Sequence, residues 1–267
     1  GKFTDLSRYF REKLKPFGKG KPFAINTVQL LPLNKPIKES PYAMVSSYAL
    51  NEDYIDWSEV EDVEDKQSTL APIDEIDSVH WENLRLREFE IATRAYKKFI
   101  LQRDTQQWKS FIRFTQENAF WLDEYAEFMA MWKISGESPK GTWSKEYALS
   151  IKKDTLFNEY MGLYKYMQWL AYQQLKNALA VIHEQGGKVL FDYPMFRAKF
   201  GAEKYYHPEY FIDRSPGIWS EFWGDSVLWN WTALRKDNHS FIINPVTHWL
   251  KFGFDGLRLD AAHFAYN

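Results

Sequence analysis

Three short apolar segments, separated by long helical patterns, constrain the fold of this chain more than any other feature. They are residues 24–33 (AINTVQLLPL), 188–193 (KVLFDY) and 255–260 (DGLRLD). Strands that alternate with helices form parallel sheets, because a right-handed helical crossover returns the chain to the same end of the sheet. The pattern predicts an α/β fold. A (β/α)₈ TIM-type barrel needs about 250 residues without insertions, so we expect only the first half of one in these 267 residues.

Helical patterns fill most of the chain between the first and second strands. Apolar residues recur at helical spacing through 81–133 and 158–184, which predicts amphipathic helices there. Gly186 and Gly187 are expected to cap the second stretch. The chain is therefore expected to divide into three parts: residues 1–80 begin the barrel, 81–180 form an inserted helical subdomain, and 181–267 continue the barrel.

The segments around the last strand carry their own signals. Residues 195–240 are irregular and aromatic, and a long irregular stretch inside a domain is usually functional. After it, Asn244 is expected to cap a helix with Pro245 at its first position, and Gly253 is expected to end that helix.

Composition excludes several classes of function. The 34 basic and 36 acidic residues leave a net charge of −2, so we expect no field that attracts nucleic acid or an anionic membrane. No apolar run approaches the roughly 20 residues of a membrane span. The chain has no cysteine and six scattered histidines, which predicts no metal site and fits a cytoplasmic protein. Its 12 Trp can serve either a thick core or sugar-stacking platforms.

The segment DGLRLD carries the clearest chemistry. Side chains alternate along a strand, so Leu257 and Leu259 share one face and Arg258 and Asp260 the other. If the leucines pack on helices, Arg258 and Asp260 point into the barrel, with Asp260 at the strand end where barrel enzymes place catalytic groups. Pairing with Arg258 would lower the pKa of Asp260 by about 1–3 units. That suits a glycosidic nucleophile, although an ordinary Arg–Asp pair fixing a strand end gives the same pattern.

Several segments together resemble a known family. FGFDGLRLDAAHF (252–264) resembles the nucleophile strand of the α-amylase clan. Further segments resemble the first strand, helical insertion, third strand and following loop of amylomaltases, which are 4-α-glucanotransferases. These segments are VQLLPLNKPIKESPYAMVSSYALNEDYID (28–56), NAFWLDEYAEFMAMWK (118–133), GTW (141–143), YMQWLAYQQL (166–175), KVLFDYPMF (188–196) and Leu228-Trp229. They occur in the family's order and cover roughly residues 24–265.

The resemblance implies a role for each matched residue. Asp260 would be the nucleophile of a retaining double displacement between α-1,4-glucans, with no cofactor, and Arg258 would orient it and keep it charged. Substrate-binding roles fall on Tyr42, Asn51, Asp56, Asp192, Trp229 and His263. Each of these has a structural alternative as a turn, capping or packing residue.

The chain also departs from the family. Ala261, Ala262, His263 and Phe264 follow Asp260 where amylomaltases usually have His-Phe-Arg-Gly, and FRAKFGAEKYY (196–206) is unusual after the third strand. The segment AAHFAYN after Asp260 contains no carboxylate, whereas a retaining enzyme needs an acid/base about 5–5.5 Å from its nucleophile. That Glu and a third Asp are expected from later strands. The alternatives are an α-amylase-clan hydrolase and a non-catalytic maltooligosaccharide-binding protein.

Overall fold

A three-stranded parallel sheet forms one end of the molecule. The computed structural model describes residues 2–14, 26–37, 41–66, 81–136, 143–214, 226–260 and 262. The strands are β1 (Thr27–Gln29), β2 (Lys188–Pro194) and β6 (Gly256–Asp260), in the order β1-β2-β6 with every pair parallel. The predicted parallel sheet is therefore confirmed, with β1 shorter than the segment from which it was predicted.

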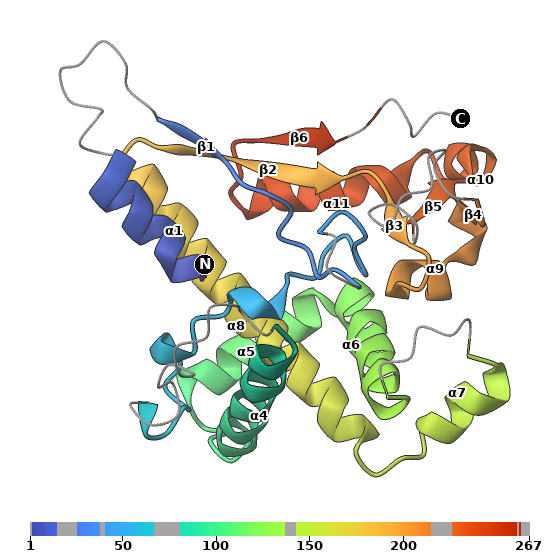
Figure 1. Cartoon of the computed structure of the whole chain (residues 1–267), viewed down its shortest axis with the longest axis horizontal. Helices are drawn as coiled ribbons and strands as arrows, with labels where there is room; N and C mark the ends of the chain where they lie inside the picture. Colours follow the sequence, from blue (N-terminus) through green and yellow to red (C-terminus); the bar gives the residue numbers. More distant parts are fainter. Residues whose placement is uncertain are drawn as a thin grey trace.

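The helices form a block beneath the sheet. Figure 1 shows α8 running from the sheet into this block, with α1 beside its upper half and α11 under the sheet. The helices are α1 (Phe3–Tyr9), α4 (Trp81–Phe99), α5 (Gln106–Glu117), α6 (Ala119–Ile134), α7 (Lys145–Ile151), α8 (Phe157–Glu184), α9 (Ala202–Tyr206), α10 (Trp231–Lys236) and α11 (Ser240–Phe252). A short π-helix (Phe10–Leu14) extends α1, and one continuous apolar core joins the sheet to α4, α5, α6 and α8.

The end of α8 leads directly into β2. Gly186 has a φ of 76° and its N–H bonds to the carbonyl of His183, while the N–H of Gly187 bonds to the carbonyl of Ile182. This pair of bonds is the Schellman motif, which favours glycine because the first of the two residues is left-handed. The predicted glycine cap is confirmed.

The irregular region after β2 contains a small antiparallel sheet. Its strands are β3 (Arg197–Ala198), β5 (Ser226–Trp229) and β4 (Phe211–Ile212), in the order β3-β5-β4. Two strands of two residues each carry no readable alternation, so the sequence pattern did not reveal them. Figure 1 places this sheet beside α9 and α10, at the end of β2.

The predicted start of the last helix is wrong. Helix α11 begins at Ser240, and Pro245 lies inside it rather than at its first position. The side chain of Asp237 accepts the N–H of Phe241 at 2.8 Å, so an upstream carboxylate satisfies a first-turn donor. Gly253, with a φ of 133°, ends the helix as predicted.

One face of β6 also differs from expectation. Leu257 is half-buried against the core, but Leu259 is 46 % exposed. Strand β6 pairs only with β2 among the described strands, so the helices that pack against the sheet do not reach the far end of this outer strand.

Candidate active site

Strands β2 and β6 bring three charged side chains together at their carboxyl ends. Asp192 on β2 lies directly opposite Arg258 on β6, and Pro194 lies opposite Asp260. Because strand residues alternate in direction, Arg258 and Asp260 share one face of β6. The parallel pairing therefore places Asp192 beside an Arg-x-Asp pair that comes from sequence about 66 residues away.

Arg258 connects the carboxylates. Its Nη1 donates to Oδ2 of Asp192 at 2.6 Å, and its Nη2 donates to Oδ1 of Asp260. It also forms a hydrogen bond with the side chain of Tyr42, in the loop after β1. Four of the predicted site residues are thus in one hydrogen-bonded cluster. A single guanidinium that binds two carboxylates holds both in fixed orientations, because its donors form a planar fork.

Burial differs sharply across this cluster. The side chain of Asp192 has no exposed surface, that of Asp260 is 15 % exposed and that of Arg258 is 42 % exposed. Burial raises the pKa of Asp192, although the hydrogen bond from Arg258 opposes that rise. The same hydrogen bond, with the nearby charges of Asp192 and Asp260, raises the pKa of Arg258. With both acids ionised, the cluster carries a net charge of about −1.

A buried ion pair between Arg197 and Glu203 lies next to this cluster and contacts strand β2 beside Asp192. The Nε of Arg197 donates to Glu203 at 2.6 Å, and a further nitrogen of Arg197 donates to the hydroxyl of Tyr193, the neighbour of Asp192. Glu203 in turn accepts the backbone N–H of Ser47 at 2.5 Å. The network ties β2 to the loop that carries Tyr42. Sequence reasoning missed it, since Arg197 and Glu203 match no motif and only the fold places them against Ser47.

Asn51 and Asp56 lie in capping positions. The side chain of Asn51 accepts the N–H of Asp53 at the start of a 3-10 helix (Glu52–Tyr54), and that of Asp56 accepts the N–H of Ser58 at the start of the next (Trp57–Glu59). Asp56 also bonds to Thr4. Among the described residues, no hydrogen bond of either side chain reaches the Arg258 cluster, so the structure supports the turn alternative for both.

Trp229 does not line an open groove, which corrects the prediction for this residue. The residue is 1 % exposed, and its ring stacks on Phe211 and donates the indole N–H to the carbonyl of Met195 at 2.8 Å. Arg197 lies over the ring, 4.9 Å from its centroid. The surrounding aromatic residues bury it completely. His263, the remaining predicted site residue, lies outside the described residues.

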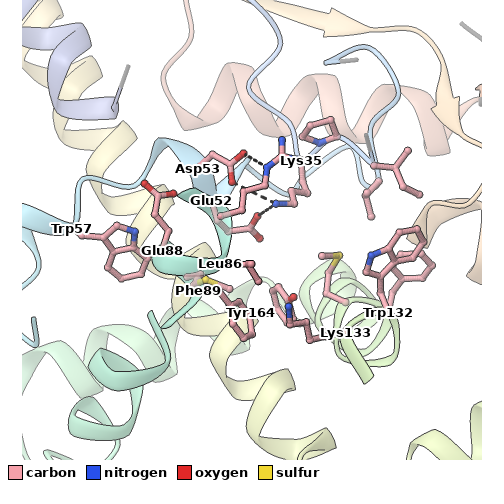
Figure 2. Close-up of a pocket in the computed structure, with 17 residues that line it drawn as sticks. Lys35, Glu52, Asp53, Trp57, Leu86, Glu88, Phe89, Trp132, Lys133 and Tyr164 are labelled. Carbon is pink, nitrogen blue, oxygen red and sulfur yellow. Dashed lines mark hydrogen bonds and ion pairs between the residues drawn. The ribbon is translucent and has the colours of Figure 1, made fainter. Parts of the chain in front are cut away.

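A separate cavity of about 430 Å³ lies between the loop after β1 and the helices α4, α6 and α8. Figure 2 shows Lys35 reaching toward Glu52 and Asp53 on one side, with Phe89, Trp132 and Tyr164 on the other. The Lys35 Nζ is 2.9 Å from Glu52. None of the four cluster residues lines this cavity. Its walls come from several distant segments, so no local pattern in the sequence predicts it.

Two negative observations apply to the described residues. They contain no group of three or more His, Asp or Glu side chains that could hold a metal ion. Nor does any helix in the described part of the chain combine the length and apolar character needed to cross a bilayer.

The chain is similar in sequence to several curated proteins along most of its length. The chain is 28 % identical to the 4-alpha-glucanotransferase of Thermus thermophilus over 262 residues, covering 88 % of this chain and 50 % of the relative. It is 28 % identical to the 4-alpha-glucanotransferase of Aquifex aeolicus over 261 residues, covering 88 % of this chain and 51 % of that one. The chain thus spans about half the length of the curated relatives it matches.

Solved structures show the same fold. The amylomaltase of Streptococcus agalactiae, solved in complex with acarbose, superposes with a TM-score of 0.81 at 20 % identity, over 98 % of this chain and 56 % of that one. The amylomaltase of Corynebacterium glutamicum gives 0.71 at 14 % identity, over 97 % and 38 %. The fold is that of part of the amylomaltase (β/α)₈ barrel, as predicted. The 4-alpha-glucanotransferase family profile matches residues 20–265, and because that is most of the chain, the chain belongs to this family.

Proposed function

We propose that this protein, at its native length, transfers segments of α-1,4-glucans between maltooligosaccharides by retaining double displacement, with Asp260 as nucleophile. Asp260 attacks the anomeric carbon, the glycosidic oxygen leaves with a proton from an acid, and a 4-hydroxyl of a second glucan displaces Asp260. The observation that carries the proposal is the contact of Arg258 with both Asp192 and Asp260 at the strand ends.

Each residue in the cluster has a separate part in this proposal. Arg258 fixes one oxygen of Asp260, which leaves the other free to attack. Asp192, which is fully buried, anchors Arg258 from the neighbouring strand. The net negative charge of the cluster favours the positive charge that develops at the anomeric carbon in an oxocarbenium-like transition state. Tyr42, which bonds to Arg258, is proposed to contact the sugar bound at Asp260.

The acid/base is proposed to come from the half of the family's length that this chain does not span. Asp192 is unsuited to that role, because its Oδ2 accepts a hydrogen bond from Arg258 and the whole side chain lies inside the protein. The substrate class, α-1,4-glucans, and a cytoplasmic location are part of the same proposal, the latter because the 267 residues include no cysteine.

The test is maltotriose disproportionation by the protein at its native length. We expect Asp260→Ala to lower the rate by several orders of magnitude while glucan binding is largely kept. Asp255→Asn is the matched control: this acid lies just before the same strand but bonds to Val189 and His183 instead. Retained turnover in Asp260→Ala would exclude the nucleophile role.

The products separate this proposal from its rivals. A transferase gives both longer and shorter glucans, a hydrolase gives glucose and maltose without longer products, and a binding protein leaves the chain-length distribution unchanged. A fluorinated glycosyl donor that slows the second step should also add one sugar to the peptide containing Asp260. Labelling of any other peptide would contradict the assignment.

A further inference from the structure

A second cavity, of about 200 Å³, lies where α6, α9 and the first turns of α11 meet the loop after β1. We call it the α6–α9 pocket. It shares no lining residue with the larger cavity and includes none of Tyr42, Asp192, Arg258 and Asp260. It is therefore a separate site from both features described above, and neither the sequence motifs nor the comparisons assign it a role.

Aromatic rings from three segments line this pocket. Phe120, in the first turn of α6, is 62 % exposed, and its ring meets that of Tyr48 edge-on at 5.3 Å between centroids. Phe241 of α11 contributes a third ring, held by stacking on Tyr210 at 4.3 Å. A large exposed aromatic side chain beside a concave surface is a common feature of ligand sites.

Each acidic side chain that lines the pocket already has a basic partner. Glu124 of α6 lies 2.9 Å from the Nε2 of His207 of α9, and Glu203 is already paired with Arg197. His207 is the only lining residue that can carry a positive charge, and it already contacts Glu124. A phosphate or carboxylate ligand would therefore meet no free positive charge on these walls.

Two uncharged polar groups remain available for a ligand. Among the described residues, neither the hydroxyl of Tyr48 nor the exposed side-chain amide of Asn244 has a hydrogen-bond partner, and both line the pocket. A hydroxyl and an amide can each donate and accept. Together with the aromatic rings they match a ligand that has apolar C–H faces and a rim of hydroxyl groups.

We propose that the α6–α9 pocket binds a neutral pyranose, as a free mono- or disaccharide or as the end unit of a glucan. The aromatic rings would pack on the C–H face of the sugar, while Tyr48 and Asn244 would bond its hydroxyls. The volume is below the about 300–1,000 Å³ of sites for drug-sized ligands, so one or two sugar rings fit and a long chain does not. The choice of glucose as the sugar rests on the proposed function.

The test counts maltose molecules bound at saturation by equilibrium dialysis with labelled maltose. It uses the Asp260→Ala protein at its native length, so that no turnover occurs. We expect Phe120→Ala and Asn244→Ala, each added to that background, to weaken one class of maltose sites about tenfold, as loss of an aromatic or polar contact of about 1.4 kcal/mol would do. Tyr147→Ala, which removes an exposed ring on α7 outside both cavities, should leave binding unchanged.

The outcomes distinguish this proposal from the catalytic one. If Phe120→Ala and Asn244→Ala bind maltose as the parent does, the pocket is not a sugar site, whatever the protein catalyses. If both variants weaken one class of maltose sites, and the parent protein with Asp260 intact carries out disproportionation, both proposals stand. If both variants weaken one class of maltose sites but the parent protein with Asp260 intact transfers no glucan, the pocket proposal stands and the catalytic proposal fails.

Discussion

Arg258 and Asp192 are direct partners on neighbouring parallel strands, and the Nη1 of the arginine donates to the Oδ2 of the aspartate at 2.6 Å. The aspartate is fully buried whereas the arginine is 42 % exposed. A buried carboxylate is thus neutralised by a cation that reaches it from the open side of the strand. Loss of the arginine would leave that carboxylate without its partner, which is costly inside a protein.

Arg258→Ala should therefore destabilise the fold. We expect the free energy of unfolding to fall by about 1–3 kcal/mol, the usual penalty for leaving a buried polar group unpaired. Urea denaturation measures it. Asp192→Asn in the Arg258→Ala background should recover part of the loss, because the buried group is then uncharged. Equal stability of Arg258→Ala and the parent would mean that water replaces the arginine without penalty.

The buried pair of Arg197 and Glu203 should matter far more than a surface pair close by. Arg197→Ala leaves the charge of Glu203 buried without its cationic partner, for which we expect a loss of about 3–5 kcal/mol. The control is Lys204→Ala, which breaks an ion pair with Asp213 at 3.4 Å whose acid is 64 % exposed. Such surface pairs contribute about 0–1 kcal/mol. Thermal or urea unfolding of the two variants side by side would reveal the difference, and similar losses would contradict it.

Gly162 in α8 should resist substitution by alanine. A Cβ at this position would collide with the ring of Tyr96 on α4, whose Cζ would be 2.8 Å away. Alanine normally stabilises a helix interior by about 1 kcal/mol relative to glycine, but here overpacking should reverse the sign and cost about 1–3 kcal/mol. In a Tyr96→Ala background the same change should become stabilising. Denaturant midpoints test this, and stabilisation in the parent would show that the helices shift apart freely.

His248 should make the protein less stable in acid. Burial lowers its pKa from 6.5 to about 4. Tyr172 uses its only proton on the carbonyl of Tyr48, so the 3.1 Å contact with His248 is assigned as a bond from the histidine Nε2–H. Because the unfolded chain takes up a proton near pH 6.5 and the folded one only near 4, stability falls as the pH drops between these values, by up to about 3 kcal/mol.

The matched control for that experiment is His207, whose pKa the hydrogen bond to Glu124 raises. A raised histidine pKa stabilises the fold fully below the unfolded value of about 6.5, and that contribution is lost as the pH rises through the folded value. Unfolding free energies from pH 4 to 8 should therefore show a weaker acid loss in His248→Gln and a larger one in His207→Gln. The same slope in all three proteins would refute both assignments.

Local pattern in the sequence was enough to find the three strands of the parallel sheet, the long helices and the glycine cap of α8. It also predicted that Arg258 and Asp260 share a face, and the resemblance added Tyr42 and Asp192 to the same place. Those features depend on alternation, helical period or motif, which are properties of short segments. The contact between Asp192 and Arg258 additionally depends on the strand order, which places β2 beside β6.

Features that depend on distant neighbours were not predictable in the same way. Trp229 is buried because Phe211 and Arg197 cover it, and Leu259 is exposed because no described helix reaches it. Proline is common at the first position of a helix, which suggested a start at Pro245. Helix α11 starts earlier, at Ser240, where the carboxylate of Asp237 accepts the N–H of Phe241. In each case a contact made by the folded chain outweighed the local preference.

The hydrogen bond from the indole N–H of Trp249 to the carbonyl of Ser47 joins residues 202 positions apart, with the whole helical block between them. On a ribosome that adds about 5–20 residues per second, roughly 10–40 s would pass between the synthesis of the two. During that time the loop that carries Tyr42 and Ser47 would lack its hydrogen bond from Trp249. Helices α4 to α8, whose contacts are more local, have an opportunity to fold first, so the nascent chain is expected to hold a helical domain well before the site can assemble.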